Sequence, residues 1–199
     1  MGSLKVVICF AIFFSLNVRA EDTTTTSNPA NTRYVRVGTF NLRFLGHNFG
    51  QRSTEDIERL GKYIGGLPFD VLGVQEVNPS GDDDKDGRKD LDQMMNALGE
   101  PYQISVSSDD SQSGRQLRVG VIWNTQKLEL LSMELLPVES EAAIKGTDLI
   151  TFKRKPIIAH FRSRKQNGVD FYLIVVHFKS CRDSVVTLQH EAKHLADWY

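Results

Sequence analysis

Cysteine is nearly absent from this chain, which has 199 residues and contains Cys9 and Cys181 alone. A disulfide framework of the kind that holds small secreted domains together is therefore excluded. Long hydrophobic runs are also lacking, since no segment approaches the roughly 20 apolar residues that span a bilayer. No Asn-x-Ser/Thr sequon with x other than proline occurs, so we expect no N-linked glycan. Neither sign of charge predominates, since 24 basic and 25 acidic residues give a formal net charge of −1. This net charge by itself favours no class of partner.

The first 20 residues have the pattern of a secretory signal peptide. Lys5 supplies a positive charge, Val6 to Leu16 form an apolar run of eleven residues, and Val18-Arg19-Ala20 resembles a cleavage site. A buried amino-terminal helix is the alternative, but the acidic, threonine-rich stretch that follows offers nothing to pack against. We therefore expect cleavage after Ala20, a disordered linker over residues 21–32, one domain over residues 33–199, and secretion from the cell.

Hydrophobic periodicity predicts strands that alternate with helices. Ser53 can cap a helix in which Ile57, Leu60 and Ile64 form one apolar face. Residues 71–77 form an apolar run without alternation, which is typical of a strand covered on both faces. We predict strands over residues 34–42, 71–77, 102–106, 117–123 and 128–135, a hairpin of residues 156–161 and 171–178 with its turn at Asn167-Gly168, and helices over residues 53–64, 90–98 and from about 184. This order of elements indicates a layered α/β architecture.

Charges are unevenly distributed along the chain. Residues 76–110 hold ten acids and three bases, whereas residues 143–182 hold nine Lys or Arg and two acids. A basic stretch can supply phosphate contacts to nucleic acid, and a soluble hairpin surface is the alternative interpretation. The basic side chains proposed to contact a nucleic acid are Lys153, Lys155, Arg162, Arg164 and Lys165.

Two predicted strands end in polar side chains that carry oxygen. Asn41 ends the strand that begins at Tyr34, and Glu76 lies at the end of the strand over residues 71–77. If these strands pair side by side, an amide oxygen and a carboxylate enter one crevice. Mg²⁺ prefers oxygen ligands and often takes one or two protein carboxylates. A turn residue and a solvated strand end are the alternative interpretations of the two residues taken singly.

The neighbours of these residues extend the pattern into four blocks. Thr39-Phe40-Asn41-Leu42-Arg43, Val74-Gln75-Glu76-Val77, Phe152-Lys153-Arg154-Lys155-Pro156 and Val175-Val176-His177-Phe178-Lys179-Ser180 follow one another along the chain. In this order they resemble the motifs of the endonuclease/exonuclease/phosphatase (deoxyribonuclease I-like) superfamily, over about residues 34–199. The resemblance implies a four-layer αββα sandwich, which we expect to be incomplete at its carboxyl end.

The resemblance also implies a role for four residues. Asn41 and Glu76 would hold a divalent metal, Mg²⁺ first and Mn²⁺ or Ca²⁺ as alternatives. His177 would act as general acid or base beside the scissile phosphate, and Arg154 would bind the phosphate. The chemistry agrees, because a phosphodiester reaction builds negative charge that a metal, an arginine and a proton donor stabilise. A strand-end histidine and a solvated turn arginine are the alternatives. We expect a secreted, metal-dependent phosphodiesterase that hydrolyses DNA.

The chain departs from the family pattern in several places. A glycine–aspartate–x–asparagine loop and a terminal aspartate–histidine pair are not found up to Tyr199, so we expect these 199 residues alone to be close to inactive. Cys181 would then be either a free thiol or the partner of a cysteine beyond Tyr199. Asn78 stands where the deoxyribonuclease branch has arginine, and no histidine-orienting glutamate is evident near Leu117 and Arg118. A sphingomyelinase-like phospholipid phosphodiesterase and a catalytically incomplete secreted binding protein are the alternative functions.

Two further patterns resemble metal sites. His190-Glu191-Ala192-Lys193-His194 matches the H-E-x-x-H motif of zinc proteases. We interpret it as a chance match, because both histidines would lie opposite an apolar stripe formed by Val185, Leu188, Ala192 and Leu195. Residues 82–87 match the start of a calcium loop, but Gln93 stands where the bidentate glutamate is required. We therefore expect a solvated acidic loop there.

Overall fold

The computed structural model describes residues 5–9, 16–19, 34–46, 52–78, 88–108, 117–138, 144, 152, 154–165, 168–178 and 185–199. Within these ranges the elements follow in the order β1 (Lys5–Cys9), β2 (Leu16–Arg19), β3 (Tyr34–Leu45), α1 (Thr54–Gly65), β4 (Val71–Val77), α2 (Arg88–Leu98), β5 (Tyr102–Val106), β6 (Arg118–Asn124), β7 (Leu128–Leu135), β8 (Ile157–Ser163), β9 (Asp170–Val175) and α3 (Val185–Trp198). None of the helices in the described ranges is long and apolar enough to cross a membrane.

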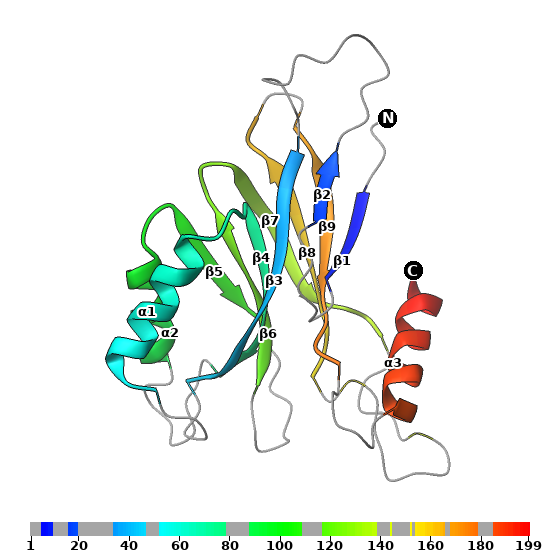
Figure 1. Ribbon diagram of the computed structural model, residues 1–199. Helices are drawn as coiled ribbons and strands as arrows, with labels where there is room; N and C mark the ends of the chain where they lie inside the picture. The colour runs from blue at the N-terminus through cyan, green and yellow to red at the C-terminus, as the bar shows by residue number, and fades with distance from the viewer. Residues whose placement is uncertain are drawn as a thin grey trace.

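Two sheets form the centre of the molecule, and helices cover their outer faces (Figure 1). One sheet has the strand order β2-β3-β4-β6-β5, and the other has the order β1-β9-β8-β7. The strands β3 and β4 are parallel, whereas β4 with β6 and β8 with β9 are antiparallel. Helices α1 and α2 lie against the five-stranded sheet, and α3 lies on the far side of the four-stranded sheet (Figure 1). This arrangement confirms the αββα sandwich predicted from the sequence.

Three buried clusters fill the spaces between the four layers. The inter-sheet cluster includes Val121 from one sheet and Leu173 from the other. A second cluster joins the five-stranded sheet to α1 and α2 and includes Ile64 and Met94. A third cluster joins the four-stranded sheet to α3 and includes Leu195. Because apolar burial is the main favourable term in folding, these clusters fix the relative positions of the layers.

Local sequence signals account for most of the elements. The Ser53 hydroxyl accepts the Asp56 N–H at 3.1 Å and caps α1, whose residues Ile57 and Ile64 are buried. The strand β4 has the bounds predicted from its apolar run, and it is buried along most of its length. The predicted hairpin is confirmed by the pairing of β8 with β9. Asn167 of the predicted turn and the acidic residues 82–87 lie outside the described residues.

The buried face of α3 differs from the predicted one. Leu195 is buried as predicted, but Val185, Leu188 and Ala192 are exposed, and the helix buries Thr187 and Glu191 in their place. At about 100° per residue, the inward face is rotated by roughly a quarter turn from the predicted apolar stripe. The prediction was wrong because it ranked faces by hydrophobicity, whereas Glu191 is held inward by a backbone hydrogen bond from the facing loop, at Phe152. His190 is exposed beside this buried glutamate, so the H-E-x-x-H residues do not share one open face.

Two amino-terminal strands lie at sheet edges. β1 pairs in parallel with β9, and β2 pairs antiparallel with β3. Each is the outermost strand of its sheet. If residues 1–20 are cleaved as a signal peptide, β9 and β3 become the edges and the order of the remaining strands is unchanged. The predicted linker over residues 21–32 lies outside the described residues.

Candidate active site

Irregular backbone turns Glu76 toward the end of β4. The pairing of β4 with β6 shifts register between Val74 and Val77. Both valines nevertheless pack in the cluster beneath the helices, a spacing of three that a regular strand cannot place on one face. Glu76 sits inside this irregularity and has a left-handed φ of 59°. Such a conformation is rare for residues other than glycine and is often found at functional sites.

A matching irregularity lies next to it in β3. The register between β3 and β4 shifts between Asn41 and Leu45, where Arg43 and Phe44 have φ values of 47° and 61°. Asn41 precedes the shift and has Gln75 as its Cα partner on β4. The two parallel strands therefore lose regular geometry at the same level, immediately beside Asn41 and Glu76.

Asn41 and Glu76 contact one another across the two strands. The Asn41 Nδ2 donates to Glu76 Oε1 at 2.9 Å, and the Arg43 N–H donates to Asn41 Oδ1 at 2.7 Å. Asn41 is exposed, while the Glu76 side chain keeps 15% of its surface accessible. The juxtaposition predicted from the sequence is present, with the carboxylate held partly out of water.

His177 reaches this pair from the other sheet. Phe171, Leu173 and Val175 of β9 face the inter-sheet cluster, and His177 continues that alternation two residues beyond the strand. Its Nε2 lies 3.4 Å from Glu76 Oε1, and its side chain is only 5% exposed. Its Nδ1 is buried and makes no hydrogen bond within the described part of the chain. The site thus lies at one end of the space between the sheets and draws residues from both.

The environment of Glu76 favours its ionised form. Burial alone would raise the pKa of this carboxyl, but hydrogen bonds from His177 and Asn41 act in the opposite direction. The nearby charges of His177 and Arg154 add to the lowering, so the pKa of Glu76 lies below its usual range. The carboxylate is therefore negatively charged at neutral pH.

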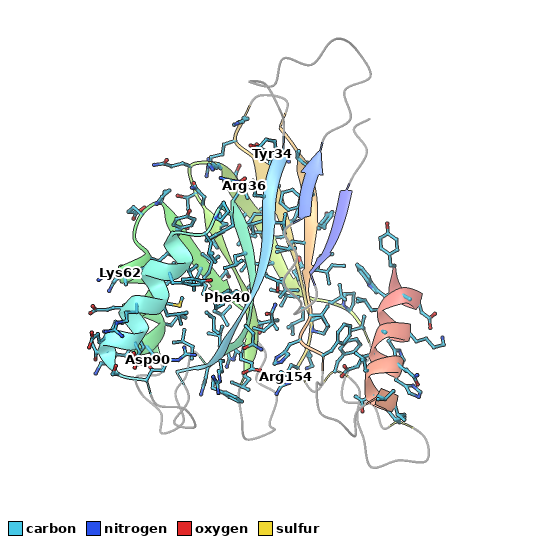
Figure 2. The ribbon with its side chains drawn as sticks, in the orientation of Figure 1. Tyr34, Arg36, Phe40, Lys62, Asp90 and Arg154 are labelled. Atoms are coloured by element: carbon cyan, nitrogen blue, oxygen red, sulfur yellow. The ribbon has the colours of Figure 1, made fainter. Side chains whose placement is uncertain are left out.

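Arg154 lies close enough to Glu76 to stabilise its charge. Figure 2 shows Arg154 at the lower edge of the sheets, at the end opposite Tyr34 and Arg36. The arginine is half-buried, and the residues Phe152 and Pro156 on either side of it are buried. The Pro156 carbonyl accepts the Leu136 N–H at 2.8 Å, which ties this loop to the end of β7. Lys153 lies outside the described residues.

The oxygen donors of this site suit a hard cation. Glu76 Oε1 accepts hydrogen bonds from Asn41 Nδ2 and His177 Nε2, whereas Oε2 accepts no hydrogen bond from the described residues. Asn41 Oδ1 has a second lone pair beyond the one used by Arg43. No group of three or more His, Cys, Asp or Glu able to hold a metal occurs among the described residues. Mg²⁺ does not require such a cage, because it keeps several waters and binds through one or two carboxylates.

Sequence analysis assigned no role to two residues that neighbour the site. Gln75 is fully buried, and its Nε2 donates to Thr39 Oγ1 at 2.8 Å, which links β3 to β4 directly beside Asn41. A polar residue inside an apolar strand was the available signal. Arg118 is the Cα partner of Val77, and its Nη1 donates to the Ser107 carbonyl at 3.0 Å. The family resemblance would place a histidine-orienting glutamate near this position, and the sequence has Leu117 and Arg118 there.

Asn78 is buried in this structure. It is 1% exposed, and its backbone N–H donates to the Leu45 carbonyl at 2.8 Å. The position where the deoxyribonuclease branch carries an arginine therefore offers no exposed cation here.

The basic residues proposed to contact a nucleic acid are divided between two ends of β8. Lys155 precedes the strand at the end where Ile157 pairs with Val175, close to His177. Arg162 lies at the other end, where it pairs with Asp170 and forms an ion pair with it at 3.3 Å. Arg164 follows it and donates to the Thr125 carbonyl at 2.8 Å. At about 3.3 Å per residue, the two ends are roughly 16 Å or more apart.

The sequence matches no family model and no curated protein. The fold is similar to solved structures. D. rerio TDP2, complexed with a single-strand DNA product, is 18% identical at a TM-score of 0.55, covering 81% of this chain and 52% of that one. The human Nocturnin catalytic domain with a bound sulfate anion is 13% identical at a TM-score of 0.55, covering 93% and 60%. An endonuclease/exonuclease/phosphatase from Bacteroides vulgatus is 16% identical at a TM-score of 0.50, covering 81% and 61%. The chain thus spans between half and two thirds of the length of these proteins.

Proposed function

We propose that this chain, which has the fold of the endonuclease/exonuclease/phosphatase superfamily, acts as a divalent-metal-dependent phosphodiesterase with DNA as its substrate. The observation that carries the proposal is the meeting of Asn41 and Glu76 from one sheet with His177 from the other, 3.4 Å from the carboxylate. Arg154 places a positive charge near Glu76 at the same end of the molecule. A metal-binding carboxylate, a proton-transfer group and a guanidinium are the groups that phosphodiester hydrolysis needs.

Glu76 and Asn41 would hold the metal, with Mg²⁺ proposed first and Mn²⁺ or Ca²⁺ as alternatives. When bound, such a cation supplies Lewis-acid stabilisation of charge on a phosphate oxygen. Glu76 suits this role because its lowered pKa keeps it ionised and its Oε2 accepts no hydrogen bond from the described residues. Asn41 adds a neutral oxygen that does not compete for protons.

His177 and Arg154 would act on the substrate. The His177 Nε2 faces the site, so a proton would be taken up or released at that nitrogen. Imidazole is suited to this step because one ring nitrogen can accept a proton while the other donates one. Arg154 would bind the phosphate through its planar guanidinium, which can donate to two oxygens at once.

DNA is the substrate that the surroundings favour. Lys155 and Arg154 provide positive charge at the end of the molecule where the site lies. The D. rerio TDP2 structure contains a single-strand DNA product, and the human Nocturnin domain binds a sulfate anion, so proteins of this fold accept DNA and tetrahedral anions. Secretion after cleavage behind Ala20 belongs to the same proposal and rests on the amino-terminal sequence pattern.

A second candidate is a metal- and phosphate-binding protein with little turnover. It is favoured by one observation: the buried His177 Nδ1 makes no hydrogen bond within the described residues. A general base is normally oriented by a third group on its second nitrogen. A histidine without that group can bind at the site while transferring protons poorly.

The test compares the purified chain with a version extended by the glycine–aspartate–x–asparagine loop and the aspartate–histidine pair, each with Mg²⁺ on supercoiled plasmid and on a single-stranded oligonucleotide. The phosphodiesterase proposal expects the extended version to show cleavage that EDTA abolishes and that His177→Ala reduces by about 10²–10⁴-fold, while the 199 residues alone stay close to inactive. His190→Ala serves as the matched control, because His190 is exposed on α3. Metal-dependent DNA binding without cleavage by the extended version would support the second candidate, and cleavage unaffected by His177→Ala would refute the assigned role.

A further inference from the structure

A buried glutamate in α3 has no part in the site described above. Glu191 is 2% exposed and lies on the inward face of the helix with Thr187 and Leu195. Its Oε1 accepts the backbone N–H of Phe152 at 2.9 Å. These two residues are 39 positions apart, so the bond fastens α3 to the loop that carries Arg154.

Burial of Glu191 is energetically unfavourable unless hydrogen bonds compensate for it. It packs beside an apolar cluster that contains Leu136, Ile174, Val176 and Leu195. Glutamate is rarely buried, because removing a carboxyl group from water is unfavourable unless hydrogen bonds compensate. A leucine would fill an apolar helix face without that penalty. The bond from the Phe152 N–H is one interaction that compensates for this burial.

Phe152 is held in an uncommon conformation at the start of the Arg154 loop. Its φ is 38°, in the left-handed region that residues with a side chain seldom adopt. Its ring is buried to 1% exposure and lies 6.4 Å from the ring of Phe178, the residue after His177. Such a backbone persists only where its surroundings over-determine it. The ring is fixed by packing, and the N–H is fixed by Glu191.

We infer that Glu191 is a positioning residue for phosphate binding: it fixes Phe152 so that Arg154, two residues later, stays beside Glu76. The inference rests on the function proposed above, since it assigns the reason why Arg154 is held there. In this inference Glu191 acts through the loop backbone, at the Phe152 N–H. The bond to the Phe152 N–H needs only an acceptor oxygen, so glutamine should keep this bond and methionine should lose it.

The first experiment needs no substrate. Hydrogen exchange at the Phe152 amide is followed by NMR in the chain and in Glu191→Gln, Glu191→Met and Thr187→Val. Thr187→Val is the matched control, because Thr187 lies on the same buried face and its hydroxyl makes no hydrogen bond within the described residues. Protection should persist in the Gln and Val variants and fall by about 10-fold or more in the Met variant. Unchanged protection in Glu191→Met would overturn the inference.

The second experiment asks whether Glu191 acts through Arg154. Binding of a fluorescent single-stranded oligonucleotide is measured in EDTA over a range of salt concentrations. Glu191→Met and Arg154→Ala should each weaken binding by about 10-fold and lower the log–log salt slope by about 0.7, the value for one phosphate contact on a single strand. Glu191→Met should have no further effect in the Arg154→Ala background. Additive losses would overturn the coupling.

The two experiments separate failure of the inference from failure of the proposed function. If the chain binds no oligonucleotide, the nucleic-acid proposal fails, while Phe152 exchange still decides the role of Glu191. If Glu191→Met does not fold, the inference is tested with Glu191→Gln alone. The inference requires Glu191→Gln to keep both Phe152 protection and the binding that depends on Arg154. A Gln variant that behaves like Arg154→Ala would overturn it.

Discussion

Replacing Glu76 by glutamine tests the candidate metal site most directly. Glutamine keeps the shape of the side chain and an acceptor oxygen for Asn41 Nδ2 and His177 Nε2, the two groups that donate to Glu76 Oε1. It removes the negative charge, which is the feature that attracts a hard divalent cation. Since the fold keeps its hydrogen bonds, we expect the melting temperature without metal to change by no more than a few degrees.

The size of the effect on metal affinity follows from the position of the carboxylate. Two unit charges 4 Å apart interact by about 4 kcal/mol at the effective dielectric of about 20 that holds near a protein surface. Glu76 is 15% exposed, so water screens it incompletely. An interaction of that size corresponds to roughly 10³-fold in a dissociation constant. We therefore expect Glu76→Gln to weaken Mg²⁺ binding by at least about 10²-fold.

The affinity is measured by isothermal titration of Mg²⁺ into the chain and into the variant at pH 7. Glu129→Gln is the control, because Glu129 is an exposed strand glutamate away from the site. Wild-type affinity should also persist well below neutral pH and fall as the pH drops through the pKa of Glu76, which lies below the usual glutamate range. Equal Mg²⁺ affinity in wild type and Glu76→Gln would remove Glu76 from the metal site and refute the electrostatic argument.

Three further predictions concern other parts of the chain. Asp70→Asn should lower the free energy of unfolding by about 2–3 kcal/mol in urea, because the buried carboxylate accepts the Arg36 N–H at 2.9 Å and Lys127 Nζ at 2.6 Å. Burial would raise the pKa of Asp70, but hydrogen bonds from Arg36 and Lys127 lower it below its usual range. The contribution of Asp70 to the free energy of unfolding is therefore present above about pH 4 and is lost as the pH falls below that value. Equal acid sensitivity of wild type and Asp70→Asn would contradict this. Arg154→Ala should reduce the salt slope of oligonucleotide binding, whereas Arg164→Ala at the far end of β8 should not. Secreted material should begin at Glu21 on amino-terminal sequencing, and retention of Met1 would argue against this route of secretion.

The sequence alone predicted most of the elements and indicated the candidate site residues. Apolar runs and a cap specify local structure through contacts close in the chain, so the bounds of β4 and the Ser53 cap of α1 were predictable. The four short blocks indicated Asn41, Glu76, Arg154 and His177, and the parallel pairing of two adjacent apolar strands was enough to bring Asn41 beside Glu76.

Only the tertiary structure decided how the layers meet. The approach of His177 to Glu76 joins two different sheets, and no local pattern encodes the end at which they converge. The strand irregularities at Glu76 depend on pairing with neighbouring strands, because period-two alternation alone would have placed its side chain on the helix side. The inward face of α3 was set by the Phe152 N–H, a donor 39 residues away that Glu191 satisfies. A buried backbone donor must find an acceptor, and that requirement outweighed the most hydrophobic face of the helix.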